Sequence, residues 1–451
     1  MLLPGLAKER EVLYPLRIQG KYQSVRSVVG NLLIAFLVVM PWVRIGGHQS
    51  LLFDLDARRF FVFGGTFTPR DTILLVVLGL GITFSLFFVT ALFGRLWCGY
   101  ACPQTVFLDS WIRPLEEWIE GPRAMRRLRD QRPLGFARIW RKALKWSLFA
   151  LLSGGISVTV VSYLTPVWPL WSGEGPVWAY GLAAVLGFLG FWDLAWFREQ
   201  FCSFLCPYAR FQGALTDESS LVISYDLPRG DERANVKTRR QAPEKDFGDC
   251  LDCDKCVAVC PYGVDIREGY QLECINCARC VDACTSVMAK QGKESLIRYS
   301  TEAQDQGQER RSWLRPRTVA YVGLLTTLSI SLVVLMLGRS TLDASIGRAP
   351  GMLFTVEEDG GVRNIYMLQV TNQTEQTMEV SLSVEEDFFL TAPPITLEPT
   401  QARSVAVVLQ ARPEQIISET LPVHLHVSSG QEERILEATF KTPGNTAGAP
   451  E

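Results

Sequence analysis

The chain is organised around residues 250–284, which read CLDCDKCVAVCPYGVDIREGYQLECINCARCVDAC. It holds eight of the twelve cysteines of the chain. Two runs of the form Cys-x2-Cys-x2-Cys-x3-Cys follow each other, one from Cys250 to Cys260 and one from Cys274 to Cys284. The first run is followed by a proline, whereas Thr285 stands at the equivalent place after the second. Such a run is typical of a loop that curls around a cubane iron–sulfur cluster.

The order of the thiols predicts how two [4Fe–4S] clusters share them. Three closely spaced thiolates can bind three irons of one cubane, and the fourth, beyond the x3 gap, then points to the neighbouring cluster. We therefore expect one cluster to be held by Cys250, Cys253, Cys256 and Cys284, and the other by Cys274, Cys277, Cys280 and Cys260. Zinc ribbons are the alternative, but they use two Cys-x2-Cys knuckles and not two runs of four.

The composition indicates a membrane protein. Of the 451 residues, 48% are hydrophobic, and the apolar residues are too segmented for a single soluble domain. Five stretches are long enough to cross a bilayer core of about 30 Å. They lie at approximately 28–45, 71–94, 144–165, 176–197 and 318–338. No small-residue cleavage site ends the first stretch, so we expect no cleavable signal peptide.

The distribution of Lys and Arg predicts the orientation in the membrane, because basic residues accumulate on the cytoplasmic side. Five precede the first stretch and ten lie between residues 94 and 142, whereas residues 166–175 contain none. We therefore expect a bacterial inner-membrane protein with the tail 1–27 and the segment 198–317 in the cytoplasm. That side is reducing, which suits cysteines that act as metal ligands and not as disulfides.

The predicted fold class is a membrane α-helical protein with five transmembrane helices, a cytoplasmic dicluster ferredoxin-like insert and a periplasmic immunoglobulin-like β-sandwich. The expected domains are the four-helix membrane domain 28–197, the cytoplasmic segment 198–317 with its clusters at about 245–290, the fifth span 318–338, and the β-sandwich 340–451. Period-two alternation between Asn, Gly and Pro turns predicts the sandwich. The alternating runs are Tyr366–Val370, Met378–Val384, Val405–Leu409 and Val423–Val427.

The remaining four cysteines form two matching motifs, Cys98-Gly-Tyr-Ala-Cys102-Pro103 and Cys202-Ser-Phe-Leu-Cys206-Pro207. Each directly follows an expected span, the second and the fourth. Aromatic residues recur at equivalent places around them: Trp97 and Phe201, Phe93 and Phe197, and Phe107 and Phe211. The offset from 98 to 202 is 104 residues. We therefore expect an internal two-helix repeat, packed about a pseudo-twofold axis.

The spacing of these thiols favours a metal site. Residues at i and i+4 lie on one side of a helix, so we expect each pair on one helix and the two pairs face to face. The four thiolates would come from Cys98, Cys102, Cys202 and Cys206. Such a soft set suits Cu(I), zinc or a further iron–sulfur cluster, and spacing alone does not choose among them. Buried thiols that only pack are the alternative.

Three further polar side chains are weaker candidates. Asp193 lies in the fourth span, where an acidic residue is a candidate functional group, but it can equally pair with Arg198 or Arg95. His424 and His426 share one face of an expected strand. They can either bind a metal or form the wet face of an edge strand.

The order of these parts resembles one known family, the cbb3-type cytochrome c oxidase accessory proteins of the CcoG, FixG and RdxA group. The matching features are the two CxxxCP pairs, the Arg198-Glu199-Gln200-x-Cys202 lead-in, the double run of eight cysteines, the Arg315-Pro316-Arg317 start of the last span and the β-sandwich. The resemblance covers essentially the whole chain. It is carried by the order of the parts more than by any single motif.

The resemblance implies a membrane-bound iron–sulfur protein that reduces Cu(II) to Cu(I) on the cytoplasmic side and supports copper delivery in cbb3-type oxidase assembly. It implies two [4Fe–4S] clusters and a copper site at Cys98, Cys102, Cys202 and Cys206. The implied partners are copper as substrate, a cytoplasmic electron donor, oxidase-assembly or copper-transport proteins and the membrane. No nucleic acid is expected, and a homodimer is left open.

Two other functions stay open at this point. NapH-type quinol dehydrogenases share the spans, the CxxxCP pairs and two clusters, and such a protein would pass electrons across the membrane. The chain has only three histidines, His48, His424 and His426, and none lies in a span, so we expect no haem in the bilayer. A passive copper chaperone or scaffold with purely structural clusters is the third candidate.

The expected orientation can be tested with a reporter enzyme fused after residue 345. The loop at residues 94–142 has ten basic residues and the loop at 166–175 has none, which predicts that residue 345 lies in the periplasm. A reporter that works only in the periplasm should therefore be active at this fusion point. Cytoplasmic activity of the matched reporter at the same fusion point would contradict both the orientation and the placement of the clusters.

Overall fold

The computed structural model describes residues 13–68, 71–131, 133, 135–307, 315–351, 353–357, 360–374, 376–385, 387–399, 401–415, 418–430 and 432–443. The first twelve residues of the expected N-terminal tail therefore lie outside the described residues. The chain divides into two compact units, Met1–Gly64 with Leu75–Leu332, and Gly65–Leu74 with Val333–Glu451. The first unit contains all the cysteines, and the second contains the β-sandwich.

Five helices of the described chain are long and apolar enough to cross a membrane, which agrees with the number expected. They are α1 (Lys21–Val39), α2 (Thr72–Phe93), α7 (Phe136–Val161), α9 (Val177–Trp192, continued by the π-helical turn η4, Asp193–Phe197) and α16 (Pro316–Leu337). Two of them begin earlier than expected, at Lys21 instead of 28 and at Phe136 instead of 144. Their first turns are rich in Lys, Arg and Gln, which favour helix although they are not apolar.

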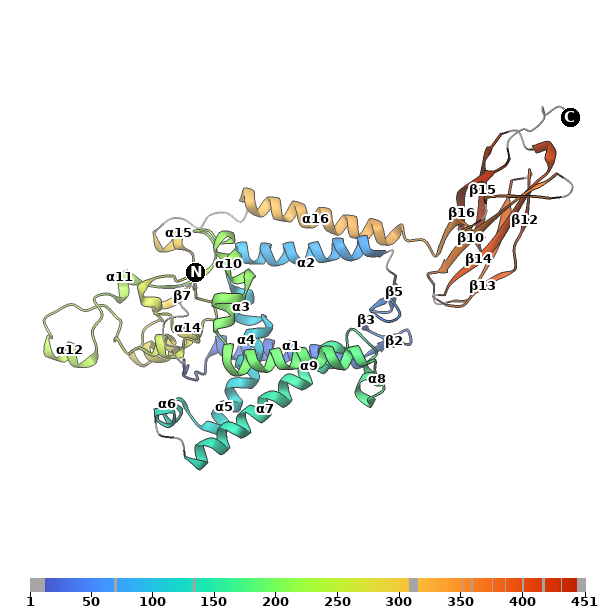
Figure 1. The fold of residues 1–451 in the computed structure, drawn as a ribbon. Helices are drawn as coiled ribbons and strands as arrows, with labels where there is room; N and C mark the ends of the chain where they lie inside the picture. Colours follow the sequence, from blue (N-terminus) through green and yellow to red (C-terminus); the bar gives the residue numbers. More distant parts are fainter. Residues whose placement is uncertain are drawn as a thin grey trace, which may run out of the picture. The chain divides into compact units, whose positions relative to one another are not determined.

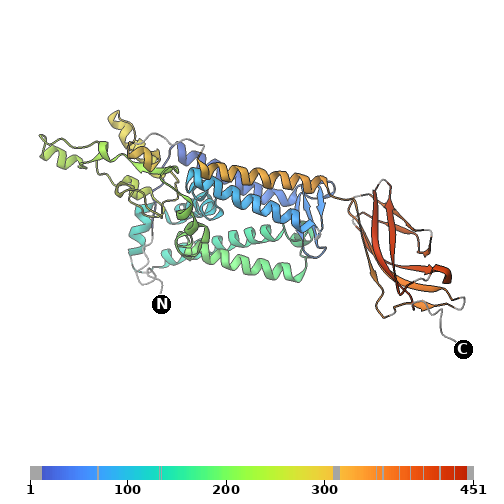
Figure 2. The same ribbon diagram turned by 90° about the horizontal axis from the view of Figure 1, so that it is seen from above.

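The helices of the first unit pack in pairs. α7 lies along α9 (Figure 1), where a side chain at Gly187 would meet the Ser157 hydroxyl at 3.0 Å. Small residues at such a contact let two membrane helices approach closely. Figures 1 and 2 both place α16 beside α2, and the ring centroids of Phe88 and Tyr321 lie 6.2 Å apart between them.

Short elements connect these helices. Between α1 and α2 lie η1 (Met40–Trp42), β1 (Arg44–Ile45), β2 (His48–Gln49), β3 (Leu51–Asp54), β4 (Arg59–Val62) and β5 (Gly65–Phe67). After α2 come α3 (Leu96–Tyr100), α4 (Pro103–Phe107), the π-helical turn η3 (Leu108–Ile112), α5 (Arg113–Glu120) and α6 (Arg123–Gln131). α8 (Val167–Ser172) precedes α9, and the π-helical turn η5 (Phe201–Leu205) and α10 (Pro207–Leu215) follow it.

The cluster segment is framed by two antiparallel strands, β6 (Val222–Tyr225) and β7 (Ile297–Ser300). Between them lie α11 (Leu227–Gly230), α12 (Val236–Gln241), α13 (Lys255–Val259), η6 (Ile266–Glu268), α14 (Arg279–Met288) and η7 (Ala289–Gln291), and α15 (Glu302–Asp305) follows. A small apolar core joins the strands to α14 through Ile223, Val281 and Met288. Cysteines Cys250 and Cys284 pack against this core, so the fold of the segment places both cysteine runs.

A carboxylate from the cluster segment caps the first apolar helix. The Asp282 carboxylate of α14 accepts hydrogen bonds from the backbone amides of Tyr22 at 3.2 Å and Gln23 at 2.8 Å, in the first turn of α1. The first amides of a helix lack partners within the helix, and its positive end favours an acidic group. Asp282 lies between Cys280 and Cys284, so this cap docks the cluster helix directly on α1.

A buried carboxylate on α5 holds several cations together. Glu116 is 1% exposed. It pairs with Arg126 of α6 and with Arg198 after α9, each at 2.8 Å, and with Lys145 of α7 at 3.9 Å. Burial would raise the pKa of Glu116, but the three cations outweigh it and hold the pKa below its ordinary value. The ion pairs therefore connect α5, α6, α7 and the end of α9.

The second unit is a sandwich of two antiparallel sheets, as the alternating sequence predicts (Figure 1). One sheet has the order β12 (Phe388–Thr391), β14 (Ala402–Ala411), β10 (Val362–Asn372) and β8 (Leu342–Arg348), with β9 (Thr355–Val356) also paired to β10. The other has the order β13 (Ile395–Leu397), β11 (Met378–Val384), β15 (Thr420–Ser429) and β16 (Glu432–Lys441). The helical turn η8 (Pro413–Gln415) precedes β15. Leu368, Val407 and Leu425 are fully buried between the sheets.

We predict that Glu116→Gln destabilises the protein by about 3–5 kcal/mol, because three buried cations lose the carboxylate that they share and must share Glu120 and Glu199 instead. The measurement is thermal or denaturant unfolding of the purified protein. Glu117→Gln is the matched control, since Glu117 pairs with Arg17 at the surface and its side chain is 36% exposed. That control should cost less than about 1 kcal/mol. Equal losses in the two variants would show that the buried ion pairs contribute no more than a surface pair.

Candidate functional site

The two cysteine runs fold into loops with the same backbone conformation. Asp252 and Asn276 occupy equivalent places between the first two cysteines of their runs, and both have positive φ, 47° and 53°. Asp254 and Ala278, each directly after the second cysteine, also have positive φ, 52° and 57°. Residues in the left-handed region turn successive backbone amides inward, and such concave amide groups bind anions, including iron–sulfur clusters. The cost to Ala278, about 1–2 kcal/mol for a residue with a Cβ, indicates that the loop conformation is required.

Three thiols of the first run and one thiol of the second run line a common cavity. They are Cys250, Cys253, Cys256 and Cys284. Arg267 also lines the cavity, and its guanidinium pairs with Asp252 and Asp254 at 2.8 Å and with Asp265 at 2.6 Å. These ion pairs fix the conformation of the loop that contains Asp252 and Asp254. The structure thus brings together the four thiols that the sequence predicts for one cluster.

The other four thiols are also neighbours. Cys280 interacts electrostatically with Cys277, Cys274 and Cys260, and more weakly with Cys256. Burial raises the pKa of Cys280 well above its ordinary value, so the free thiol stays protonated at neutral pH. Cys260 comes from the first run, at the end of α13, where the following Pro261 favours an extended backbone. Each run therefore contributes its fourth thiol to the neighbourhood of the other.

The donor set fits two iron–sulfur clusters. Each group combines four thiols with an inward-facing amide loop, and both features suit a cubane that carries negative charge. When bound, such clusters store and transfer single electrons. Among the described residues, no group of three His, Cys, Asp or Glu side chains converges closely enough to hold a single metal ion. The ligands of a cubane surround a larger group and lie farther apart than the ligands of one ion.

The expectation that each CxxxC pair lies on one helix is wrong. Cys98 belongs to α3, but Cys102 precedes α4 with an extended backbone, at φ −61° and ψ 127°. Cys202 lies in the turn η5, and Cys206 precedes α10 with φ −68° and ψ 111°. A proline follows each second cysteine, and the residue before a proline is pushed out of helical conformation. The same proline begins the next helix, where its missing amide costs nothing.

The four CxxxC thiols nevertheless share one neighbourhood. Electrostatic interactions link Cys98 with Cys102 and Cys202, and Cys102 with Cys206. Burial raises the pKa of Cys98 to about 12 and that of Cys202 to about 11. The free thiols are therefore protonated at neutral pH. The four thiols are near one another but are not arranged as a closed single-ion site in the described structure.

The CxxxC site lies directly against the loop of the second cysteine run. Cys98, Ile275 and Cys277 form one buried cluster, with Tyr208 and Tyr262 packed on it. This contact depends on a glycine, because a Cβ at Gly99 would lie 2.6 Å from the Ile275 carbonyl oxygen and 3.1 Å from the Cys277 Cα. Only a residue without a side chain allows the two backbones to approach so closely.

Two polar side chains complete this contact. Gln212 of α10 is fully buried, and its Nε2 donates a hydrogen bond to the Cys98 sulfur at 3.2 Å. Tyr262, two residues after Cys260, hydrogen-bonds the Cys202 thiol. The sequence patterns do not identify Gln212, Tyr262 or Gly99 as parts of the site. The only available signal was that Gly99 stands where the second motif has a serine, and nothing in the sequence pairs Gln212 with Cys98.

The weaker candidates have separate partners. Neither arginine suggested for Asp193 pairs with it, because Arg198 binds Glu116 and Arg95 donates to the Ala209 carbonyl oxygen at 2.8 Å. Gln104 hydrogen-bonds the Asp193 carboxylate, whose buried Oδ1 has no partner in the described structure.

The two histidines do share one face of β15, as expected. Each contacts a different carboxylate, however, His424 with Glu385 at 2.6 Å and His426 with Glu433 at 2.7 Å. The pair therefore matches the polar face of a strand.

Three family models match separate parts of the chain. A 4Fe-4S dicluster domain matches residues 197–302, and a 4Fe-4S binding domain matches residues 75–122. The model described as "IG-like fold at C-terminal of FixG" matches residues 332–443. The 4Fe-4S binding domain at residues 75–122 covers Cys98 and Cys102 but none of the eight cysteines of the double run.

Several characterised proteins are similar over most of their length. "Nitrogen fixation protein FixG" of Rhizobium meliloti is 33% identical over 84% of this chain and 80% of its own. "Protein RdxB" of Cereibacter sphaeroides is 32% identical over 95% of this chain and 91% of its own. "Ferredoxin-type protein NapH" of Haemophilus influenzae is 23% identical over 51% of this chain and 70% of its own. A crystal structure of a FixG-related protein from Vibrio parahaemolyticus, 23% identical, covers 23% of this chain and 99% of its own, with a TM-score of 0.22.

The exchange of the fourth thiol can be tested with paired double variants. If the neighbourhoods seen here are the ligand sets, Cys256→Ala with Cys284→Ala removes one cluster, and about four of about eight iron atoms should stay. Cys256→Ala with Cys260→Ala removes a ligand from both clusters, and most of the iron should be lost. Iron analysis after anaerobic purification is the measurement. The reverse pattern would mean that each run holds its own cluster.

Proposed function

Because this chain belongs to the FixG and RdxA family of iron–sulfur electron-transfer proteins, we propose that it reduces Cu(II) to Cu(I) and so supports copper delivery to a cbb3-type oxidase. The copper ion is the substrate, and the four CxxxC thiols receive it. One electron per ion is the whole reaction, so no general acid or base is needed. Bound [4Fe–4S] clusters supply single electrons.

The buried cluster that Cys98 and Cys277 share with Ile275 is the observation that carries this proposal. A thiol of the CxxxC site and a thiol of the second cysteine run lie in one buried cluster, so an electron needs no long path between them. Thiolates favour the soft Cu(I) ion over Cu(II), and a thiol-rich site therefore draws the couple toward reduction. The residues provide short distance, soft ligands and shelter from water.

We assign the cluster ligands by the neighbourhoods described above. Cys250, Cys253, Cys256 and Cys284 hold one cluster, and Cys274, Cys277, Cys280 and Cys260 hold the other. The cluster with Cys277 is then the one nearer to copper. The more exposed first run, in which Cys253 is at the surface, is the place for a soluble electron donor.

The sidedness is part of the proposal. The distribution of basic residues supports a cytoplasmic cluster segment and a periplasmic sandwich in a bacterial inner membrane. A cytoplasmic donor would then reach the first run, and the sandwich would meet proteins of the periplasm that take part in oxidase assembly or copper transport.

The thiols are tested by the double variant Cys98→Ser with Cys102→Ser. It should abolish copper binding and cupric reductase activity and keep about eight iron atoms per chain. The measurements are copper and iron analysis and anaerobic reduction of Cu(II). Wild-type reduction with saturable kinetics in this variant would place the copper site elsewhere. A fall from about twelve to about eight iron atoms would show that the CxxxC thiols hold a further cluster, as the second 4Fe-4S match allows.

Gly99→Val is the companion variant for the electron path. Its side chain would push the CxxxC segment away from the Cys277 loop, since even a Cβ lies 2.6 Å from the Ile275 oxygen. Copper binding and iron content should stay, and the rate of reduction should fall. A cluster-ligand variant that still reduces Cu(II) would favour the passive copper scaffold.

Quinol oxidation is the second candidate function. The likeness to NapH supports it. Anaerobic mixing with a short-chain quinol separates the two functions. Rapid bleaching of the cluster absorbance without copper favours quinol oxidation, whereas no bleaching favours a soluble donor.

A further inference from the structure

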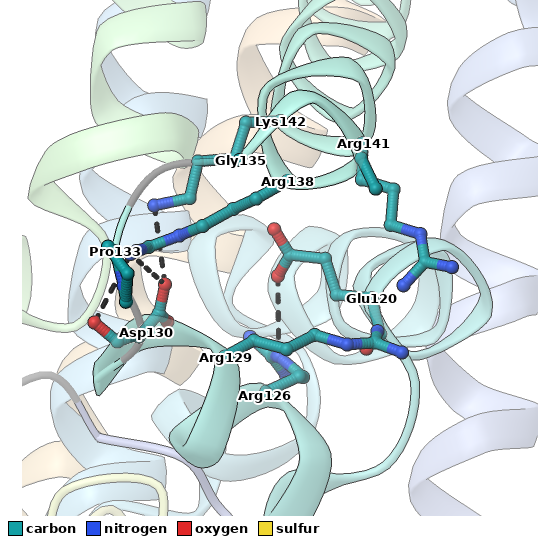
Figure 3. Close-up of a pocket in the computed structure, with 10 residues that line it drawn as sticks. Glu120, Arg126, Arg129, Asp130, Pro133, Gly135, Arg138, Arg141 and Lys142 are labelled. Atoms are coloured by element: carbon teal, nitrogen blue, oxygen red, sulfur yellow. Dashed lines mark hydrogen bonds and ion pairs between the residues drawn. The ribbon is translucent and has the colours of Figure 1, made fainter.

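A cavity of about 290 Å³ lies where α5, α6 and the first turns of α7 meet (Figure 3). Cationic side chains dominate its lining. They are Arg126, Arg129, Arg138, Arg141 and Lys142, and the acidic residues that line it are Glu120 and Asp130. All these residues belong to the first unit.

The two carboxylates are already occupied. Glu120 pairs with Lys145 at 2.7 Å and with Arg126 at 3.5 Å. Asp130 pairs with Arg138 at 3.1 Å and with Lys142 at 3.2 Å, and Figure 3 shows both contacts. The cations that these carboxylates bind are therefore compensated within the protein.

Two guanidinium groups of the cavity have no such partner. Arg129 donates a hydrogen bond to the backbone carbonyl oxygen of Glu120, which is neutral. The Arg141 guanidinium makes no side-chain hydrogen bond or ion pair among the described residues. Neither the Arg129 nor the Arg141 side chain pairs with a carboxylate of these residues. Both side chains are only partly exposed. The cavity thus has positive charge that an anion from outside can neutralise.

The start of α7 adds to this preference. α7 is 26 residues long, and its N-cap residue Gly135 supplies no side-chain hydrogen bond to the first amides. Gly135 and Ala137 both line the cavity. The first amides of a helix and its positive end attract anions such as phosphate.

Exposed apolar side chains lie on the helices that form the cavity. Phe136 and Trp140, at the start of the span α7, are 86% and 64% exposed. Met125 and Leu128 of α6 are 44% and 55% exposed. Aromatic residues at the end of a span are typical of the membrane interface.

We propose that this cavity binds the phosphate of an anionic phospholipid headgroup, with Arg129 and Arg141 as its direct contacts. Guanidinium groups bind phosphate oxygens in a bidentate manner, and a net negative headgroup supplies the missing charge. The exposed aromatic residues of α7 lie where the acyl chains begin. This inference is independent of the copper chemistry, because the residues that line the cavity include none of the proposed copper or cluster ligands.

The test compares three variants that each remove one positive charge from the full-length protein. Arg141→Gln and Arg129→Gln alter the cavity, whereas Arg127→Gln alters an exposed arginine of α6 that does not line it. Dioctanoyl phosphatidylglycerol is titrated into the detergent-solubilised protein and followed by native mass spectrometry. Binding should be saturable, and each cavity variant should weaken it by about tenfold or more, since a hydrogen bond to a charged group is lost. Arg127→Gln should bind as the wild type does.

Three further arms identify the source of the phosphate and check the fold. Dioctanoyl phosphatidylcholine should bind more weakly than the glycerol lipid, and inorganic phosphate should displace the lipid only at far higher concentration. Iron content and melting temperature should match among the variants. If Arg141→Gln does not fold, Arg129→Gln and Arg141→Lys decide, and the lysine variant should bind less tightly than the wild type because it lacks the planar fork.

Several results would overturn the proposal. Equal weakening by Arg127→Gln would mean that only general surface charge acts. Equal binding of the choline lipid would remove the preference for an anionic headgroup. Displacement by inorganic phosphate at the concentration of the lipid would assign the cavity to a soluble anion.

Discussion

A single buried carboxylate, that of Asp109, joins the parts of the first unit that the proposed chemistry needs. It pairs with Arg26 of α1 and Arg113 of α5, and it lies 3.6 Å from Arg279, the residue before Cys280. Burial would raise the pKa of Asp109, but the three guanidinium groups hold it well below its ordinary value. Three buried cations would repel one another without this charge. The first span, the segment after the first CxxxC pair and the cluster helix are therefore held at one point.

This anchoring explains how two sets of thiols from distant parts of the sequence meet. Asp282 caps α1 and Arg279 pairs with Asp109, so α14 is attached to the membrane helices on both sides of Cys280. The loop before α14 then lies against Gly99, and Cys98 reaches Cys277. Electron transfer depends on distance, and here the distance is set by buried ion pairs and by the absence of one side chain.

Irregular helical turns surround the CxxxC thiols. The π-helical turns Leu108–Ile112, Asp193–Phe197 and Phe201–Leu205 lie after the first pair, before the second and across Cys202. Such turns cost stability and often mark functional sites, because they redirect side chains that a regular helix would place elsewhere. The prolines after Cys102 and Cys206 act in the same direction, since they turn each second thiol away from the helix of the first.

The features that depend on local spacing and composition could be predicted from the sequence. The two cysteine runs indicated two clusters with an exchanged fourth thiol, the apolar stretches indicated five membrane helices, and alternation over Tyr366–Val370 indicated a strand of the sandwich, because each follows from the geometry of a loop, a helix or a strand. Which distant residues meet is a matter of the tertiary structure. Cys98 lies with Gln212 and Cys277, and Asp109 pairs with Arg279, although these residues are far apart in sequence and no local periodicity predicts such pairs. The spacing of Cys98 and Cys102 even suggested a common helix, and the backbone preference of the residue before Pro103 overrode it.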